Sequence, residues 1–270
     1  MTRFFSDAGV LRRPRAVAAA AIALATLVAA CAPTTTTSTA PAASVPPEYQ
    51  AEVVPGPNNG APIEIPPVRA AYLTDRTKRQ RVAYNGSEAP GTIVVDPYAR
   101  FLYHVLPGGE AMRFGIAVGK EGKGFSGNAN IRRKAPWPAW TPTANMVRED
   151  PALYGPVKNG LPGGLGNPLG ARALYLYRGG RDTMYRIHGT MEPSSIGKAT
   201  SAGCIRLFNQ DILDLYDNIP MGTPVHVRTS AESVRLEGPL VETPDGYLMP
   251  AGQAAPATAT TTTAAAAPRN

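Results

Sequence analysis

The chain has 270 residues, of which 43% are hydrophobic, so it can bury the core of one large domain or two small ones. Much of its proline and alanine lies in flanking segments, so the folded part is shorter than the chain. The formal net charge is +7, and four arginines against one aspartate before Cys31 supply +3 of it. No block of like charges remains, so we expect no nucleic-acid partner, whereas a mildly basic surface suits an anionic polymer.

Residues 1–31 have the pattern of an export signal. Arginines up to position 15 precede fifteen uncharged residues, Ala16 to Ala30, a stretch too short to span a bilayer comfortably. It ends in Val28-Ala29-Ala30-Cys31, which resembles a bacterial lipoprotein box, whose cysteine is lipidated and becomes the mature N-terminus. Ordinary signal-peptidase cleavage and a retained anchor are the alternatives. The expected location is extracytoplasmic: the periplasm, with a lipid anchor on Cys31, at the outer membrane if the host is Gram-negative.

Two flanking segments are expected to stay outside the core. Residues 32–70 are rich in proline, threonine and alanine and predict a flexible tether. Residues 229–270 form a C-terminal extension, expected to be disordered from about 254, where alanine and threonine dominate. The folded domain is therefore expected at 71–228.

Short strands dominate the elements predicted in this domain. Runs of β-branched and aromatic residues between turn signals predict strands, in chain order, at 92–95, 101–105, 113–118, 173–177 and 184–188. One helix follows, with Asn209 as its expected N-cap, Asp211 in its first turn and Pro220 as its stop. A strand at 224–228 closes the domain. The expected fold class is mainly β, of the α+β type.

Cys204 and His188 are the candidate catalytic pair. A histidine can activate a thiol as the nucleophile of covalent acyl transfer. With Cys31 lipidated, Cys204 has no partner in the chain, which is a liability in an oxidising compartment unless its reactivity is used. An inert buried cysteine is the alternative, against which the polar, glycine-flanked neighbourhood argues. His188 ends a predicted strand at Gly189, where its ring can project into a loop region.

Four further residues are candidates for binding substrate or stabilising the oxyanion. Gly203 lets the backbone approach a substrate closely, and amides near Cys204 suit an oxyanion. Ser201 either donates a hydrogen bond to this site or sets a turn. Arg206 points the same way as Cys204 if the segment is extended, so it favours the thiolate and binds a substrate carboxylate; a surface salt bridge is the alternative. Tyr185 is the fourth.

The other histidines and several decoy motifs carry less weight. His104 and His226 fall inside strand patterns and are interpreted as structural. Ser195 to Lys198 fits a Ser-x-x-Lys motif, but no Lys-Thr-Gly follows. The glycine-rich residues 163–168 precede a strand rather than a helix, which argues against a nucleotide site. No cluster has zinc-ligand spacing, and we expect no metal and no cofactor.

Five stretches of the chain closely resemble the catalytic domain of bacterial L,D-transpeptidases, also called YkuD-type domains. The resemblance covers roughly residues 91–228. The stretches are Trp140–Thr143, Asn167–Gly170, Ile187–Gly197, Ser201–Leu207 and Gly222–Val225.

The resemblance implies a β-sandwich of mixed sheets with short helices, and a reaction on peptidoglycan. Cys204 would attack the L-to-D peptide bond of a tetrapeptide stem and release D-alanine, and an amine on another stem peptide or on a protein would take the acyl group. The Gly189 carbonyl would orient His188, and carbapenems would acylate Cys204. One departure is Ala202, where many members carry histidine, so His188 would act alone.

Two other functions fit the same sequence. In the first, water replaces the amine and the chain is a hydrolase on the same scaffold. In the second, the chain is a non-catalytic wall-binding lipoprotein.

Overall fold

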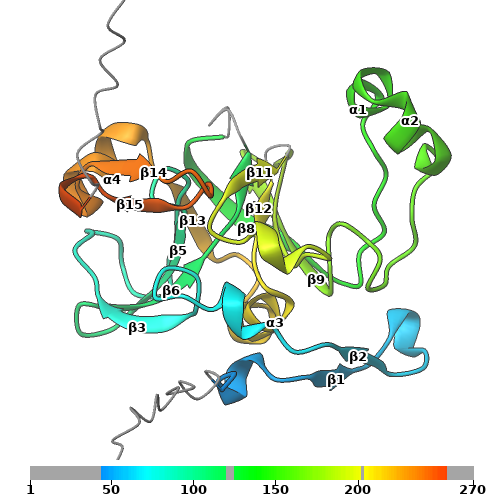
Figure 1. The fold of residues 1–270 in the computed structure, drawn as a ribbon, viewed down its shortest axis with the longest axis horizontal. Coiled ribbons are helices and arrows are strands. Elements are labelled where there is room, and N and C mark those ends of the chain that lie inside the picture. Colours follow the sequence, from blue (N-terminus) through cyan, green and yellow to red (C-terminus); the bar gives the residue numbers. More distant parts are fainter. Residues whose placement is uncertain (1–43, 120–124, 202–203, 254–270) are drawn as a thin grey trace, which may run out of the picture. The chain divides into compact units, whose positions relative to one another are not determined.

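The computed structural model describes residues 44–119, 125–201 and 204–253, without the side chain of Ser201. In this part of the chain, nine strands form one sheet in the order β12-β10-β9-β8-β13-β4-β5-β6-β3. Figure 1 shows the fold, with most of these strands labelled. Neighbours are antiparallel except for β10 with β12 and β13 with β4, which are parallel. The sheet is therefore mixed. The strands are β3 Gln80–Ala83, β4 Ile93–Asp96, β5 Phe101–Leu106, β6 Glu110–Gly115, β8 Gly127–Pro136, β9 Arg172–Arg178, β10 Arg181–His188, β12 Ile205–Arg206 and β13 Pro224–Val227.

Smaller elements surround this sheet. Three further strand pairs are β1 with β2, β7 with β11 and β14 with β15. Their bounds are β1 Glu52–Val54, β2 Ile63–Ile65, β7 Val118–Gly119, β11 Ala199–Ser201, β14 Leu240–Glu242 and β15 Leu248–Pro250. The α-helices are α1 Ala144–Glu149, α2 Pro151–Tyr154, α3 Asn209–Asn218 and α4 Ser230–Glu237. None of the helices in the described ranges has the length and apolar character to cross a bilayer. The mainly β class with short helices is confirmed.

The largest hydrophobic cluster lies between one face of the sheet and α3. Leu174 and Leu176 of β9 and Ile187 of β10 are fully buried in it, together with Ile212 and Leu215 of α3. Side chains alternate between the two faces of a strand. The residues that alternate with these three, His188 among them, therefore belong to the opposite face.

The predicted strands appear, but one of them ends earlier than predicted, and β8 and most of the short strands were not predicted. The prediction at 113–118 runs past the end of β6, which spans Glu110–Gly115. The longest strand, β8, was not predicted at all. Its charged run Arg132-Arg133-Lys134 and a register irregularity between Ile131 and Arg133 interrupt the alternation of polar and apolar residues from which strands are recognised.

Residues 44–73, which we call the strap, pack against the folded domain. Tyr49, Ile65 and Val68 are buried, and the Trp137 indole Nε1 donates to the Pro55 carbonyl at 2.7 Å. The prediction of a tether for 32–70 is therefore wrong for residues 44–70, while 32–43 lie outside the described residues. The few apolar side chains of the strap are too sparse to form a core of their own, but they become buried on the surface that the domain provides.

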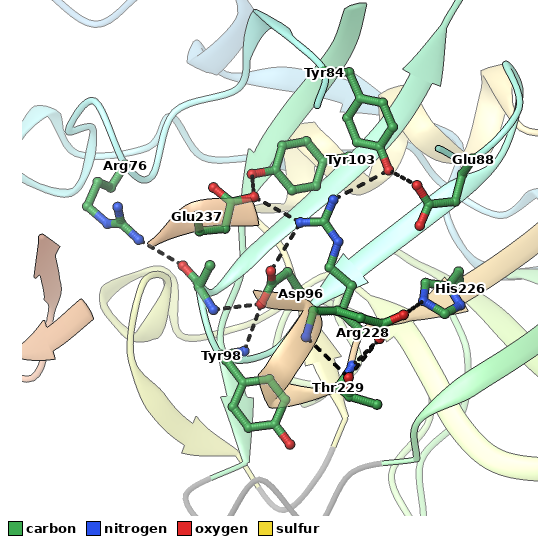
Figure 2. A network of polar contacts seen from close by, with 12 residues as sticks. Arg76, Tyr84, Glu88, Asp96, Tyr98, Tyr103, His226, Arg228, Thr229 and Glu237 are labelled. Carbon is green, nitrogen blue, oxygen red and sulfur yellow. Dashed lines mark hydrogen bonds and ion pairs between the residues drawn. The ribbon is translucent and has the colours of Figure 1, made fainter. Parts of the chain in front are cut away.

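The C-terminal extension is also ordered as far as residue 253. Thr229 and Glu232 form a capping box at the start of α4, and β14 pairs with β15 in a hairpin. Figure 2 shows Arg228, just before α4, in contact with Asp96 of β4 and with Glu237 of α4. The disorder expected from about 254 concerns residues outside the described ranges.

Helix α3 begins at Asn209, so the expected N-cap is wrong by one residue. Phe208 occupies the cap position without a side-chain bond to the helix. The Asn209 Oδ1 instead accepts from the backbone amides of Ala171 (3.0 Å) and Thr190 (3.2 Å), which belong to two loops. Asparagine is a common N-cap residue, but here the side-chain amide of Asn209 satisfies backbone N–H groups of segments distant in sequence.

Candidate active site

The candidate pair lies where β10 and β12 run parallel at one end of the sheet. Ile187 pairs with Ile205, and His188 pairs with Arg206. Both isoleucines are buried in the main cluster, so His188 and Arg206 share the other face. Cys204 directly precedes β12, two residues before Arg206, and the Arg186 backbone hydrogen-bonds its thiol. Residues sixteen apart in sequence are thereby brought to neighbouring strands.

His188 is held by a backbone carbonyl. Its Nδ1 lies 2.7 Å from the Gly189 oxygen, and the side chain is only 2% exposed. A carbonyl oxygen can only accept, so the hydrogen must be on Nδ1 and Nε2 is left as the basic nitrogen. This is the geometry that the sequence analysis expected of Gly189.

Burial and charge set the protonation of His188. Burial lowers its pKa to about 3, and the guanidiniums of Arg206 and Arg186 act in the same direction. The carbonyls of Gly189 and Leu169 oppose this by favouring the protonated ring. The imidazole is therefore neutral at physiological pH and able to accept a proton.

The Cys204 thiol is partly buried, and this burial raises its pKa above the ordinary value. The Arg186 backbone bond and the charges of Arg186 and Arg206 lower the pKa without overcoming burial. Arg206 thus acts on the thiol in the direction expected from the sequence, but it also disfavours a protonated His188. Both shifts favour a neutral thiol beside a neutral imidazole as the resting pair.

Arg206 takes part in a salt bridge. Its Nη1 lies 3.3 Å from Glu192 Oε2, and the Arg206 side chain is mostly covered while that of Glu192 is exposed. The Nε atom of Arg206 is buried and has no partner among the described residues. The salt-bridge alternative is therefore present in the structure, on the same face as His188. Binding of a substrate carboxylate stays a prediction.

Arg186 is a site residue that the sequence analysis missed. It forms a bidentate ion pair with Asp182, in which Nη1 lies 2.7 Å from Oδ1 and Nη2 lies 2.8 Å from Oδ2. The Arg186 Cζ atom lies 4.3 Å from the centre of the Tyr175 ring. It lies two residues before His188 in the same strand, so alternation places both side chains on one face. That spacing was the signal that could have found it.

The remaining predicted residues are divided between described and undescribed parts of the chain. Tyr185 packs against the main hydrophobic cluster, and its ring lies 5.6 Å from that of Phe125. Ser201 belongs to β11, and nothing is described of its side chain. Gly203, Ala202 and the lipidation candidate Cys31 lie outside the described residues. The roles proposed for these residues stay predictions.

The other two histidines are elsewhere in the sheet. His104 of β5 is half-buried, and burial lowers its pKa. His226 of β13 contacts Asn128 Oδ1 at 2.8 Å and Glu232 Oε1 at 3.3 Å. Within the described ranges, no group of three or more histidine, cysteine and carboxylate side chains is arranged to hold a metal ion.

Comparison with known proteins identifies the family. The model of the L,D-transpeptidase catalytic domain, YkuD, matches residues 90–227, about half of the chain. The chain belongs to this family.

Two curated relatives of this L,D-transpeptidase-family chain are enterobacterial. The probable L,D-transpeptidase ErfK/SrfK of Escherichia coli K12 is 38% identical over 138 residues, which are 50% of this chain and 43% of that protein. The protein of the same name from Salmonella typhimurium is 36% identical over 173 residues, 63% of this chain and 50% of that protein. The chain thus spans about half the length of these relatives.

A solved structure from Brucella melitensis also matches this family member. It is described as a probable carnitine operon oxidoreductase and is 50% identical, covering 57% of this chain and 96% of its own, with a TM-score of 0.40. That description is of the Brucella protein. A TM-score this low is a weak structural likeness, and the family assignment rests on the sequence match.

Proposed function

We propose that the chain is a cysteine-dependent L,D-transpeptidase that remodels peptidoglycan. Cys204 attacks the L-to-D peptide bond of a tetrapeptide stem and releases D-alanine. The acyl group then passes to an amine of another stem peptide or of a protein that becomes attached to the wall. Membership of the family supports this proposal. The observation that carries it is the parallel pairing of β10 with β12, which brings Cys204 beside the strand of His188.

The reaction follows from the neutral resting pair. His188 Nε2 takes the thiol proton as the sulfur bonds to the carbonyl carbon, and the negative charge moves to the carbonyl oxygen. The tetrahedral intermediate collapses, the C–N bond breaks, and the imidazolium returns the proton to the leaving amine. A thioester remains on Cys204. The acceptor amine then attacks this thioester, gives its proton to His188, and the thiol is regenerated.

The neighbouring residues have proposed roles in this reaction. The backbone around Gly203 and Cys204 stabilises the oxyanion, with Ser201 as a further donor. Arg206 binds a carboxylate of the stem through the planar fork of donors on its guanidinium. Tyr185 packs against the main cluster on the opposite face of β10, so the substrate-binding role predicted for it would be indirect, through the packing of that strand.

Intact-protein mass spectrometry tests the proposal. The full chain is incubated with a disaccharide-tetrapeptide, beside Cys204→Ala and His188→Ala. We expect an adduct equal to the donor minus D-alanine on the wild-type chain, followed by crosslinked dimer, and neither in Cys204→Ala. Release of tripeptide alone would favour the hydrolase. No adduct and no turnover, with muropeptide affinity retained in Cys204→Ala, would favour the wall-binding lipoprotein.

We further propose that Cys31 is lipidated and tethers the enzyme to a membrane on the extracytoplasmic side. The apolar stretch that ends in Val28-Ala29-Ala30 supports this proposal. Metabolic labelling with an alkyne fatty acid should mark the wild-type chain and leave Cys31→Ala unmarked. Equal labelling of both chains would contradict it.

A further inference from the structure

Asn209 binds both loops that lie beside His188. Its Oδ1 accepts from the amides of Ala171 (3.0 Å) and Thr190 (3.2 Å), and its Nδ2 donates to the Thr190 carbonyl at 2.9 Å. These three bonds use the oxygen twice and one of the two amide hydrogens. The helix itself gains nothing from this side chain, since Phe208 is the N-cap.

One peptide unit joins Asn209 to His188. The Gly189 carbonyl and the Thr190 amide belong to the same planar peptide group. The carbonyl side accepts from His188 Nδ1 at 2.7 Å, and the amide side donates to Asn209 Oδ1 at 3.2 Å. Hydrogen bonds in such a chain polarise one another, so the bond to Asn209 makes the Gly189 oxygen a better acceptor. Asn209 thus acts on both the position of the Gly189 carbonyl and its strength as an acceptor for the imidazole.

The backbone is shaped to let Asn209 come this close. A Cβ atom on Gly189 would lie 2.2 Å from Asn209 Oδ1, and one on Gly170 would lie 2.4 Å from the same oxygen. Gly170 also has a φ of +62°, a conformation that favours glycine. Any side chain at these two positions would push the asparagine away from the loops. Glycine at both positions therefore leaves the space that Asn209 Oδ1 occupies.

We propose that Asn209 is a positioning residue: it holds the Gly189–Thr190 peptide so that His188 keeps its hydrogen on Nδ1 and presents Nε2 to Cys204. The consequence for catalysis rests on the proposed function, in which His188 is the base. The effect of Asn209 on the tautomer of the His188 ring is independent of that function. In the alternative, Asn209 only ties two loops together, and its loss would lower stability without changing the tautomer of His188.

Nitrogen NMR of the histidine rings separates these two cases. The full chain has three histidines, and with ¹⁵N-labelled histidine the His188 signals are assigned by comparison with His188→Ala. In the wild type we expect a protonated Nδ1 and an unprotonated Nε2. In Asn209→Ala we expect a mixture of tautomers and a His188 pKa closer to the ordinary value, because a released ring reaches water.

Gln210→Ala is the matched control. Gln210 is the next residue of α3, and its Nε2 donates to the backbone carbonyls of Pro66 (2.9 Å) and Gln50 (3.3 Å) in the strap. The variant loses bonds of the same kind on the same helical turn, away from the His188 peptide. Its His188 tautomer and pKa should match the wild type. Equal changes in both variants, or none in Asn209→Ala, would overturn the proposal.

Asn209→Asp serves as the second variant if the alanine variant does not fold. Aspartate keeps the oxygen that accepts from both amides, so His188 should keep its hydrogen on Nδ1. A folded Asn209→Asp chain with mixed tautomers would overturn the proposal, because the acceptor would then not be what positions the ring.

Acylation by the tetrapeptide donor provides the second measurement. We expect Asn209→Ala to slow it roughly 10- to 100-fold, the range seen when an orienting partner is removed, and Gln210→Ala to leave it within about twofold. A wild-type chain that shows the fixed tautomer without any acylation would contradict the proposed function and leave the positioning role intact. Acylation at the wild-type rate in Asn209→Ala would overturn the positioning role alone.

Discussion

Burial and positive charge act together on His188 and against each other on Cys204. Both lower the pKa of the imidazole, whereas burial raises the pKa of the thiol and the two guanidiniums lower it. A preformed thiolate–imidazolium pair would need the opposite order of the two pKa values. Two neutral side chains are therefore the expected resting state of this pair.

The pH dependence of alkylation tests this resting state. In a Cys31→Ser chain, the rate at which iodoacetamide modifies Cys204 should rise with pH, with its midpoint above about 8.5, the ordinary thiol pKa. Below this midpoint the thiol is protonated and slow. His188→Ala should keep the same shape. A plateau of fast reaction between roughly pH 5 and 7 would instead show an ion pair.

Asp211 is the second residue whose ionisation is set by burial. Its side chain is fully buried in the first turn of α3, with Tyr49 Oη at 3.4 Å from Oδ2 and Arg79 Nη1 at 3.6 Å from Oδ1. Burial raises its pKa to about 8, although Arg79 and the bond from Tyr49 oppose the shift. The sequence suggested a carboxylate that favours the helix dipole, whereas burial in the structure favours the protonated acid.

Replacing Asp211 should remove a pH-dependent part of the stability. The folded state keeps a proton on Asp211 up to about pH 8, while the unfolded chain releases it near its ordinary value of 3.8. The stability from the protonated acid is thus fully present below pH 3.8, is lost progressively as the pH rises, and is gone above about pH 8. If asparagine replaces the protonated acid without other loss, we expect the advantage of Asp211→Asn over the wild type to grow from pH 5 to pH 8 and to stay constant from pH 8 to 9.

Thermal unfolding of both chains from pH 5 to 9 measures this difference. Comparing the two chains at each pH cancels the titration of all other groups. A variant less stable than the wild type at every pH would mean that Asp211 is ionised and paired with Arg79.

At the scale of elements, a buried arginine joins α4 to the sheet. Arg228 is 1% exposed, and its Nη1 contacts Glu237 Oε1 of α4 at 2.8 Å and Asp96 Oδ2 of β4 at 3.1 Å. Figure 2 also shows Tyr103 bonded to the same Glu237, at 2.8 Å. Helix α4 lies beyond residue 227, where the family match ends. The ion pairs of Arg228 therefore attach to the sheet an element that lies outside the matched domain.

Removing the arginine should destabilise the chain strongly. Arg228→Met leaves the Asp96 carboxylate buried without its partner, which costs roughly 3–5 kcal/mol. Tyr103→Phe removes one hydrogen bond to Glu237 and should cost about 1 kcal/mol. Urea unfolding of the two variants and the wild type gives both numbers. If Arg228→Met lowered the free energy of unfolding by no more than Tyr103→Phe, the ion pairs of Arg228 would not have the stabilising role expected here.

At the scale of the whole molecule, the folded unit is larger than the family domain. The strap contributes Tyr49, Val54, Ile65 and Val68 as buried side chains, and the chain after residue 227 contributes α4 and the β14–β15 hairpin. Full burial of an apolar side chain stabilises by roughly 1.5–3 kcal/mol. Four of them reach the magnitude of the whole stability of a domain, about 5–15 kcal/mol.

A fragment of residues 90–227 should therefore fail to fold alone. We expect residues 44–253 to give a cooperative thermal transition and a near-ultraviolet circular dichroism spectrum with fixed aromatic signals. The shorter fragment should lack both and bind a hydrophobic dye. A cooperative transition in residues 90–227 would show that the strap and α4 are dispensable for folding.

Local patterns were sufficient for several strands and for the candidate pair. β4, β5, β9 and β10 carry β-branched and aromatic runs between turn residues, and His188 and Cys204 stand in short stretches whose residue types fit thiol chemistry. The helix α3 was also predicted from its apolar side and Pro220, to within one residue at its start. These signals lie within a few neighbouring residues, so they can be recognised without the fold.

Contacts between distant segments could only be decided by the tertiary structure. The order of strands in the sheet, the insertion of β13 between β8 and β4, and the parallel pairing of β10 with β12 join residues far apart in the chain. The strap looked like a tether because its apolar residues are sparse, and they are buried only on a surface made elsewhere. Asn209 looked like a cap because its residue type suits one, yet the backbone groups that it satisfies come from loops 19 and 38 residues away. The sequence by itself determined which residues are the candidates for thiol chemistry, and the tertiary structure decided the partners and the pKa shifts of His188 and Cys204, because burial and long-range hydrogen bonds exist only in the folded chain.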